Sequence, residues 1–298
     1  MEPSAVSLRH EGFACWQPTG PEAMTTATFT SYAQNMEDIR LWRALRHVTR
    51  GRYIDVGAWD PQIDSVSRGF YEQGWRGVHF EPHPRLAARL RADRPDEPVH
   101  EVALSDYEGT LRFFLDGDDG TGTGDADVAR AATGLGRSLT EVVVPVTTLA
   151  RRCADLAGQE IHWMKIDVEG MEAAVLRGWD ATMLRPWIVV VEATKPDTRI
   201  QTHEAFAPLL AAADYLPAGF DGLNRYYVAR EHGDLSSLVE EPVSIFDLME
   251  GCCLSPTSPF IAGHLERLRI MEASWVWRGT WPLRALASWL GGRGLRDR

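Results

Sequence analysis

A chain of 298 residues that is 44% hydrophobic and 24% charged is long enough for one sizeable globular core and an accessory region. Its formal net charge of −11 argues against nucleic acid as the main partner, because binding a phosphate backbone needs a basic surface. The four cysteines, Cys15, Cys153, Cys252 and Cys253, lack C-x-x-C spacing, which favours reduced thiols over a zinc site.

The first 30 residues have no regular pattern and predict a flexible arm. Arg9, His10 and Glu11 stand where a secretory peptide would need an apolar core, and no stretch of about 18 apolar residues follows. We therefore expect a cytoplasmic protein without a membrane span. Ser31 and Gln34 form a capping-box pattern that predicts the start of a helix.

The segment from Arg52 to Gly74 predicts a buried strand, a tight turn and a helix. Gly57 opens the turn, Ser65 is placed to cap the helix, and Gly74 ends it. Such a turn presents backbone N–H groups and a helix N-terminus to a ligand. A cofactor site and a purely structural turn are equally compatible with this motif alone.

A second strand, Val78 to Phe80, ends at the carboxylate of Glu81. In a doubly wound sheet this carboxylate lies beside the first turn, where it can accept hydrogen bonds from a ribose diol. Trp59 and Pro61 stand where a dinucleotide-binding turn carries further glycines. Because Trp is bulky and Pro has no N–H, a pyrophosphate would fit poorly, which counts against NAD.

The middle of the chain predicts a helix from Pro84 and a third strand from Val99 to Leu104. Thr110 to Leu115 and Val142 to Val146 are expected to pair as an antiparallel ribbon. Asp116 to Leu139, between them, is rich in Gly, Asp and Thr and is predicted to be a flexible loop that closes over a substrate.

The later elements complete a sheet. Ile161 to Ile166 and Trp187 to Glu192 are predicted as buried strands, and Gly170 to Arg177 as a helix. Leu216 to Phe220 and Asn224 to Val228 are predicted as an antiparallel pair.

From residue 236 the pattern changes to a helical extension. Phe260 to Leu290 is predicted to be helical, with tryptophans among arginines. A flap packed on the domain or on a second copy is the favoured interpretation. A membrane-surface helix is the alternative, which the acidic composition and Pro282 disfavour.

Polar residues end the predicted strands, and they are expected to converge because ligands of open α/β sheets bind outside the carboxyl ends of the strands. They are Asp55, Glu81, Ser105, Asp167 and Glu192. Lys165 precedes Asp167 by two residues and so faces the same side of its strand. It would serve as a base if burial lowers its pKa, or would pair with Asp167 or Glu169; the sequence leaves both open.

These motifs occur in one order along residues 31 to 235: Tyr32-Ala-Gln-Asn-Met-Glu-Asp38, Asp55-Val-Gly57, Glu81-Pro82, Ala103-Leu-Ser105, Lys165-Ile-Asp-Val-Glu-Gly170 and Phe220-Asp-Gly-Leu-Asn-Arg-Tyr226. In this the chain resembles the FkbM family of S-adenosylmethionine-dependent methyltransferases. The resemblance implies an α/β class I methyltransferase fold, with about seven mostly parallel strands and an antiparallel last strand. It covers the methyltransferase domain over 31–235, and the change of pattern on either side predicts an arm over residues 1–30 and a helical extension over 236–298.

The same resemblance assigns roles to residues. The expected catalytic residues are Lys165, Asp167 and Glu169. The expected cofactor-binding residues are Gln34, Asp55, Gly57, Ser65, Glu81 and Ser105. Asp167 and Glu192 could also hold Mg²⁺, since both offer hard oxygen ligands, or could simply fix a loop.

The expected reaction is O-methylation of a polyhydroxylated acceptor, namely a sugar, a glycan or a glycosylated natural product. Asp221, Asn224 and Arg225, in the turn before the last strand, carry hydrogen-bonding groups suited to such an acceptor. The alternatives are a polyketide or macrolide hydroxyl and a non-catalytic scaffold that retains the fold. Homo-oligomer formation stays open.

Overall fold

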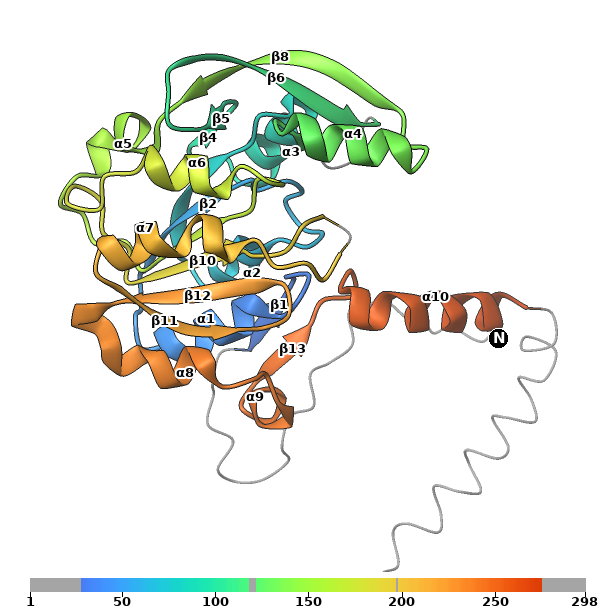
Figure 1. The fold of residues 1–298 in the computed structure, drawn as a ribbon. Coiled ribbons are helices and arrows are strands. Elements are labelled where there is room, and N and C mark those ends of the chain that lie inside the picture. Colours follow the sequence, from blue (N-terminus) through green and yellow to red (C-terminus); the bar gives the residue numbers. More distant parts are fainter. Residues whose placement is uncertain (1–27, 118–121, 197, 275–298) are drawn as a thin grey trace, which may run out of the picture. The chain divides into compact units, whose positions relative to one another are not determined.

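The computed structural model describes residues 28–117, 122–196 and 198–274 (Figure 1). The chain divides into two compact units, and the larger one ends at Ser255. The helix α10 (Pro259–Ala273) belongs to the other unit.

Within the described residues, seven strands form the central sheet. In spatial order they are β11 (Tyr215–Phe220), β12 (Asn224–Ala229), β10 (Ile188–Glu192), β9 (Trp163–Ile166), β2 (Arg52–Val56), β3 (Arg76–Phe80) and β4 (Val99–His100). Neighbouring strands are parallel except that β12 runs antiparallel to both β10 and β11. The predicted mostly parallel sheet with an antiparallel last strand is confirmed.

Helices cover both faces of this sheet (Figure 1). Side chains alternate along a strand, so Ile54 and Val56 of β2 join one apolar core and Tyr53 joins the other. The first core includes residues of α5 (Leu149–Arg152), α6 (Glu172–Arg177) and α7 (Ala207–Ala212). The second includes residues of α1 (Glu37–Leu45), α2 (Val66–Glu72) and α8 (Ser236–Glu240). The helix α3 (Pro84–Asp93) follows β3, as predicted from Pro84.

A smaller sheet lies beside the central one. In the described part of the chain its strand order is β5 (Ala103–Leu104), β8 (Leu139–Thr147), β6 (Gly109–Asp116) and β7 (Gly122–Thr123). The predicted antiparallel ribbon is confirmed by the pairing of β6 with β8. The single strand predicted over Val99 to Leu104 is wrong, because β4 pairs with β3 whereas β5 leaves the central sheet to pair with β8.

The segment from Asp116 to Leu139 is not one long loop. It contains β7 and the helix α4 (Ala126–Gly134), with 118–121 outside the described residues. Asp125 caps this helix, since its carboxylate accepts hydrogen bonds from the N–H groups of Asp127 and Val128. Alanines follow the cap and favour the helix, so a local signal that the sequence analysis overlooked explains the difference.

The entry segment also differs from the prediction. Ser31 belongs to β1 (Phe29–Ser31), which pairs with the distant β13 (Cys252–Leu254), and α1 begins at Glu37. The predicted capping box of Ser31 and Gln34 is therefore wrong, and the Ser31 hydroxyl instead donates to Asp38 at 2.6 Å. Most of the predicted arm, residues 1–27, lies outside the described residues.

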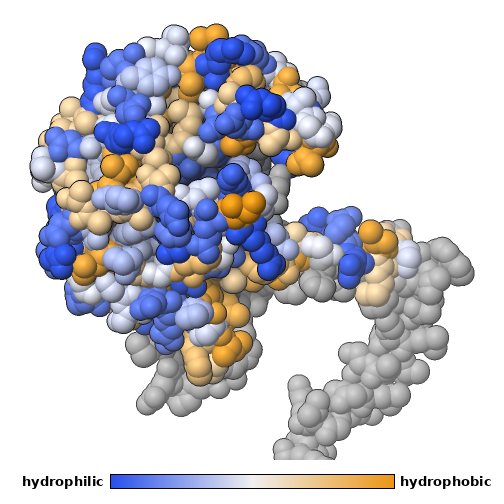
Figure 2. Space-filling view, viewed as in Figure 1, coloured by the Kyte–Doolittle hydropathy of each residue, from blue (hydrophilic) through white to orange (hydrophobic). Residues whose placement is uncertain are grey.

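Residues 236–255 belong to the same unit as the sheet. Arg40 of α1 donates to the carbonyls of Val239 and Glu240, and Val239 is fully buried. The helix α9 (Ile245–Met249) follows, and its Ile245, Phe246 and Met249 are exposed. A hydrophobic group appears at this position in Figure 2, whereas most of the face viewed mixes hydrophilic and hydrophobic residues.

The helix α10 covers the first part of the helix predicted over Phe260 to Leu290. The tryptophans of that prediction, Trp275, Trp277, Trp281 and Trp289, lie outside the described residues. No helix among the residues that the structure describes is both long enough and apolar enough to cross a membrane.

Candidate active site

A pocket opens at the carboxyl ends of β2, β3 and β9, and one wall comes from β6 and β7; we call it the inner pocket. Seven residues predicted for the site line it: Gln34, Asp55, Gly57, Glu81, Lys165, Asp167 and Glu169. Ser65, Ser105 and Glu192 do not. The ends of parallel strands meet at one sheet edge, which explains why residues so far apart in sequence converge there.

Gly57 shapes the floor of the inner pocket. Its φ is 79° and its N–H donates to the carbonyl of Phe80 at 2.9 Å. A Cβ at this position would lie 1.7 Å from the carbonyl oxygen of Asp167, so the ends of β2 and β9 come this close only at a glycine. The turn that follows contains two other left-handed residues, Trp59 and Asp64, with φ of 50° and 54°.

Glu81 is fixed at the rim of this turn. One carboxylate oxygen accepts from the N–H of Trp59 at 2.9 Å and the other from the N–H of His83 at 2.8 Å. Burial raises the pKa of Glu81 to about 7, although both backbone hydrogen bonds lower it. Each oxygen still has a second lone pair, which leaves Glu81 able to accept from a ligand.

Asp55 and Lys165 form the charged centre of the pocket. Asp55 lies beside His79 of β3 on one side and Lys165 of β9 on the other. Burial acts to raise the pKa of Asp55. The nearby His79 and Lys165 outweigh burial and lower this pKa, and the His79 Nδ1 lies 3.7 Å from the Asp55 carboxylate. Asp55 is thus held as an anion.

Lys165 takes the pairing role rather than that of a base. Its ammonium donates to Asp167 at 2.7 Å and lies 3.7 Å from Glu37. Burial acts to lower its pKa, but Asp167 and Glu37 outweigh burial and raise it. A lysine base would need a lowered pKa, so the geometry keeps Lys165 charged.

Two predicted cofactor residues are placed elsewhere. Ser65 stands at the N-terminus of α2, but its hydroxyl accepts from the buried guanidinium of Arg94 at 2.9 Å instead of capping the helix. Ser105 follows β5 into the smaller sheet, where its N–H donates to the carbonyl of Thr147. Neither serine lines the inner pocket, because each is engaged by a partner distant in the chain.

A wider cleft, lined by more polar residues, adjoins the inner pocket; we call it the outer cleft. Its walls come from α4, from residues 194–196 and 198–202, and from the turn 220–223. The two cavities share Gln34, Gly122, Asp167 and Glu169, so Asp167 and Glu169 stand at their junction.

Glu192 lines the outer cleft in an unusual state. Burial, and then the charges of Asp167 and Glu169, raise its pKa to about 11, which keeps the carboxyl neutral at pH 7. Among the described residues, its Oε2 has no hydrogen-bond partner. A ligand that donates a hydrogen bond would satisfy it.

The residues present do not fit a Mg²⁺ site. Within the described ranges, no three His, Cys, Asp or Glu side chains converge to hold a metal. Asp167 already pairs with Lys165, and burial raises the pKa of Glu192. Mg²⁺ requires several deprotonated oxygen ligands, so this predicted pair is a poor ligand set.

The predicted acceptor residues are engaged in their own turn. The Asp221 carboxylate accepts from the N–H groups of Leu223 and Asn224 and from the Tyr226 hydroxyl. Asn224 is fully buried, and Arg225 donates to Gln201. Of the three, Asp221 alone lines the outer cleft.

Glu37 is a site residue that the sequence analysis did not single out. It is fully buried, accepts from the N–H of Asn35 at 2.8 Å and is the second anion beside Lys165. Burial raises its pKa to about 7. In the sequence, Glu37 and Asp38 are adjacent acidic residues at the start of a helix. Such a pair usually belongs to a solvated first turn, so it did not indicate a buried site residue.

The sheet order, with β12 as its antiparallel strand, and the pocket at the carboxyl ends of β2, β3 and β9 define a class I S-adenosylmethionine-dependent methyltransferase fold. The family model described as the methyltransferase FkbM domain matches residues 55–217, more than half of the chain. The chain belongs to the FkbM methyltransferase family.

Comparison with curated proteins found no match. Among solved structures, an O-methyltransferase from Bacillus cereus in complex with SAH shares 13% identity and a TM-score of 0.36, over 68% of this chain and 84% of that one. A TehB-like SAM-dependent methyltransferase from Corynebacterium glutamicum shares 11% identity and a TM-score of 0.34, over 65% of this chain and 88% of that one. Scores this low add nothing to the family match.

Proposed function

We propose that this methyltransferase moves the methyl group of S-adenosylmethionine to a hydroxyl of a polar, polyhydroxylated acceptor, namely a sugar, a glycan or a glycosylated natural product. The observation that carries the proposal is the junction of the two cavities at Asp167 and Glu169. A donor in the inner pocket would present its methyl group there, and an acceptor in the outer cleft would meet it.

The donor fits the inner pocket for chemical reasons. Glu81 offers two carboxylate oxygens at the place where a ribose diol would lie, and the anions Asp55 and Asp167 suit a cationic sulfonium ligand. The turn lacks the glycines and N–H groups that a pyrophosphate needs. This disfavours a dinucleotide more than a methyl donor.

Methyl transfer from a sulfonium is an in-line displacement that depends mainly on positioning. The attacking hydroxyl forms the new C–O bond as the C–S bond breaks, and its proton must be accepted. Asp167 is suited to that task because its carboxylate stands at the junction of the two cavities, where Lys165 orients it by a hydrogen bond, and Glu169 also lines both cavities. Most side chains that line the outer cleft are polar, which favours a polar acceptor over a flat apolar one.

Calorimetry with S-adenosylhomocysteine and with NAD tests the donor. Binding of S-adenosylhomocysteine alone supports the proposal, whereas binding of NAD alone would defeat it. A methyl-transfer screen over sugars, glycolipid head groups, macrolides and catechols then tests the acceptor. Preference for a catechol over every sugar would contradict the proposal that the acceptor is polyhydroxylated.

Two alternatives remain as outcomes of these tests. Turnover of macrolides alone would indicate a polyketide-type hydroxyl. A non-catalytic scaffold would bind neither S-adenosylmethionine nor its product. Glu81 argues against the scaffold, since it is held by backbone N–H groups rather than by a cation and keeps its spare lone pairs. Homo-oligomer formation stays a prediction.

A further inference from the structure

The turn between β2 and α2 contains left-handed backbone conformations at residues that are not glycine. Trp59 and Asp64, which both line the inner pocket, have φ of 50° and 54°. Side chains other than glycine rarely adopt this backbone conformation, and it persists only where surrounding contacts enforce it. The turn therefore needs stabilising contacts from other parts of the fold.

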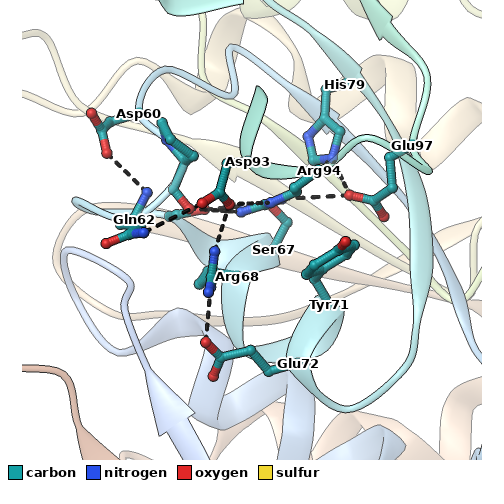
Figure 3. A network of polar contacts seen from close by, with 12 residues as sticks. Asp60, Gln62, Ser67, Arg68, Tyr71, Glu72, His79, Asp93, Arg94 and Glu97 are labelled. Carbon is teal, nitrogen blue, oxygen red and sulfur yellow. Dashed lines mark hydrogen bonds and ion pairs between the residues drawn. The ribbon is translucent and has the colours of Figure 1, made fainter. Parts of the chain in front are cut away.

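Arg94, at the end of α3, lies under this turn and is fully buried. Its Nη2 donates to the carbonyl of Pro61 and to the hydroxyl of Ser65, both at 2.9 Å. Its Nη1 donates to the hydroxyl of Ser67 in α2 at 2.6 Å (Figure 3). One planar group thus ties the middle of the turn to its end and to the helix that follows.

The guanidinium is itself held by the central sheet. Glu97 lies 3.8 Å from Nη1 and contacts His79 of β3 at 2.8 Å (Figure 3). The other oxygen of Glu97 accepts from the N–H of Gly77 at 2.6 Å and from the hydroxyl of Tyr53 at 2.7 Å. Arg94 thus connects the turn to β2 and β3, which carry Asp55 and precede Glu81.

We propose that Arg94 is the positioning residue of the methyl-donor turn, holding Pro61 and Ser65 so that Trp59 and Asp64 keep the wall of the inner pocket in its binding shape. Arg94 does not line the pocket, so it acts through the backbone of the turn. The inference rests on the proposed use of S-adenosylmethionine. A lysine could supply the charge but not the planar fork that reaches several acceptors at once.

The test compares Arg94→Lys with Arg40→Lys. Arg40 is also buried and donates to two carbonyls, of Val239 and Glu240, but it lines neither cavity. Both variants are expected to melt earlier than the natural protein. Arg94→Lys alone should weaken S-adenosylhomocysteine binding about tenfold in calorimetry below both melting temperatures, since loss of hydrogen bonds to a charged group is on that scale.

Steady-state kinetics supply a readout that a purely structural role would not change. The KM for S-adenosylmethionine should rise with the Kd in Arg94→Lys, while kcat and the acceptor KM stay within about twofold. Equal affinities for Arg94→Lys and Arg40→Lys would overturn the inference.

Ser65→Ala tests the same contact if Arg94→Lys does not fold. It removes one acceptor of Arg94 in the turn and should weaken S-adenosylhomocysteine binding about threefold, as expected for one hydrogen bond. Unchanged affinity in Ser65→Ala would then overturn the inference. A natural protein that binds neither S-adenosylmethionine nor its product would instead defeat the proposed function itself.

Discussion

The inner pocket and the outer cleft are built in different ways. The inner pocket has its polar groups fixed by other protein groups: Glu81 by two backbone N–H groups, Asp55 by His79, and Asp167 by Lys165. In the outer cleft, Glu192 is buried with one oxygen unpaired among the described residues. The comparison indicates that the polar groups of the inner pocket are preorganised, whereas Glu192 in the outer cleft still lacks a partner for one oxygen among the described residues.

The largest effect is expected from Gly57→Ala, because Gly57 makes the close backbone contact between the ends of β2 and β9 in the inner pocket. The added Cβ would lie 1.7 Å from the Asp167 carbonyl oxygen at a φ of 79°. We expect the free energy of unfolding to fall by about 3 kcal/mol or more and donor binding to be lost. Urea denaturation and calorimetry measure the two effects.

Gly74→Ala is the matched control for this substitution. Gly74 has a similar φ of 84°, but a Cβ there would meet nothing within 4 Å. It should cost about 1 kcal/mol and leave donor affinity unchanged. If both glycine variants behaved alike, the close approach of β2 and β9 would not matter to the pocket.

Glu81→Ala should be next in size. Loss of two charge-assisted hydrogen bonds to the ribose, each on the order of 1.5–3 kcal/mol, should weaken donor binding at least about tenfold. Circular dichroism checks that the fold is intact. An unchanged Kd would show that the ribose lies elsewhere.

The pH dependence of donor affinity sharpens the role of Glu81. With a pKa raised to about 7 in the empty pocket, Glu81 is largely neutral at pH 6 and ionised at pH 8. The ionised form accepts both ribose hydroxyls, so the Kd for S-adenosylhomocysteine should fall several-fold between these values. Glu81→Gln should flatten the profile; an unaltered slope in this variant would assign the titration to another group.

Stability should change with pH in the opposite direction. The pKa values of Glu37, Glu81 and Glu172 are each raised by burial to about 7. A folded pKa above the unfolded value stabilises the protein at low pH, and this contribution is lost as pH rises from the unfolded pKa through about 7. The empty protein should therefore unfold more easily at pH 8 than at pH 5.5, by on the order of 2 kcal/mol for each of these groups. Equal urea midpoints at the two pH values would contradict this.

Glu192→Gln addresses the outer cleft and should have a smaller effect. Gln keeps the size and the neutrality of the protonated Glu192. Donor affinity should stay within about twofold, while the acceptor KM rises about threefold to tenfold because the hydrogen-bonding pattern changes. A loss of donor affinity as large as that of Glu81→Ala would break the distinction between the two cavities.

The smallest effect is expected from metal removal. Asp167 pairs with Lys165, and no three ligand side chains converge within the described ranges, so EDTA should leave the methyl-transfer rate unchanged. Activity that is lost in EDTA and restored by Mg²⁺ would mean that the acceptor or donor brings these carboxylates into a different state.

The sequence by itself determined the central sheet and the polar residues that its strand ends bring to the inner pocket. Gly57, Glu81 and Asp167 are placed by local patterns, a strand followed by a turn, and the topology of a parallel sheet brings strand ends together without further information. The same topology also places Asp55 of β2 beside Lys165 of β9. It could not show their charge states, because these depend on burial and on partners such as Glu37.

Only the tertiary structure decided the rest. Arg94 donates a hydrogen bond to the hydroxyl of Ser65. Ser105 follows β5, which pairs with β8 outside the central sheet, and Ser31 belongs to β1, which pairs with β13. In each case the partner is more than 20 residues away in the chain. A local pattern limits the structural roles that a residue can take, and its partner in the tertiary structure determines which of these roles it has.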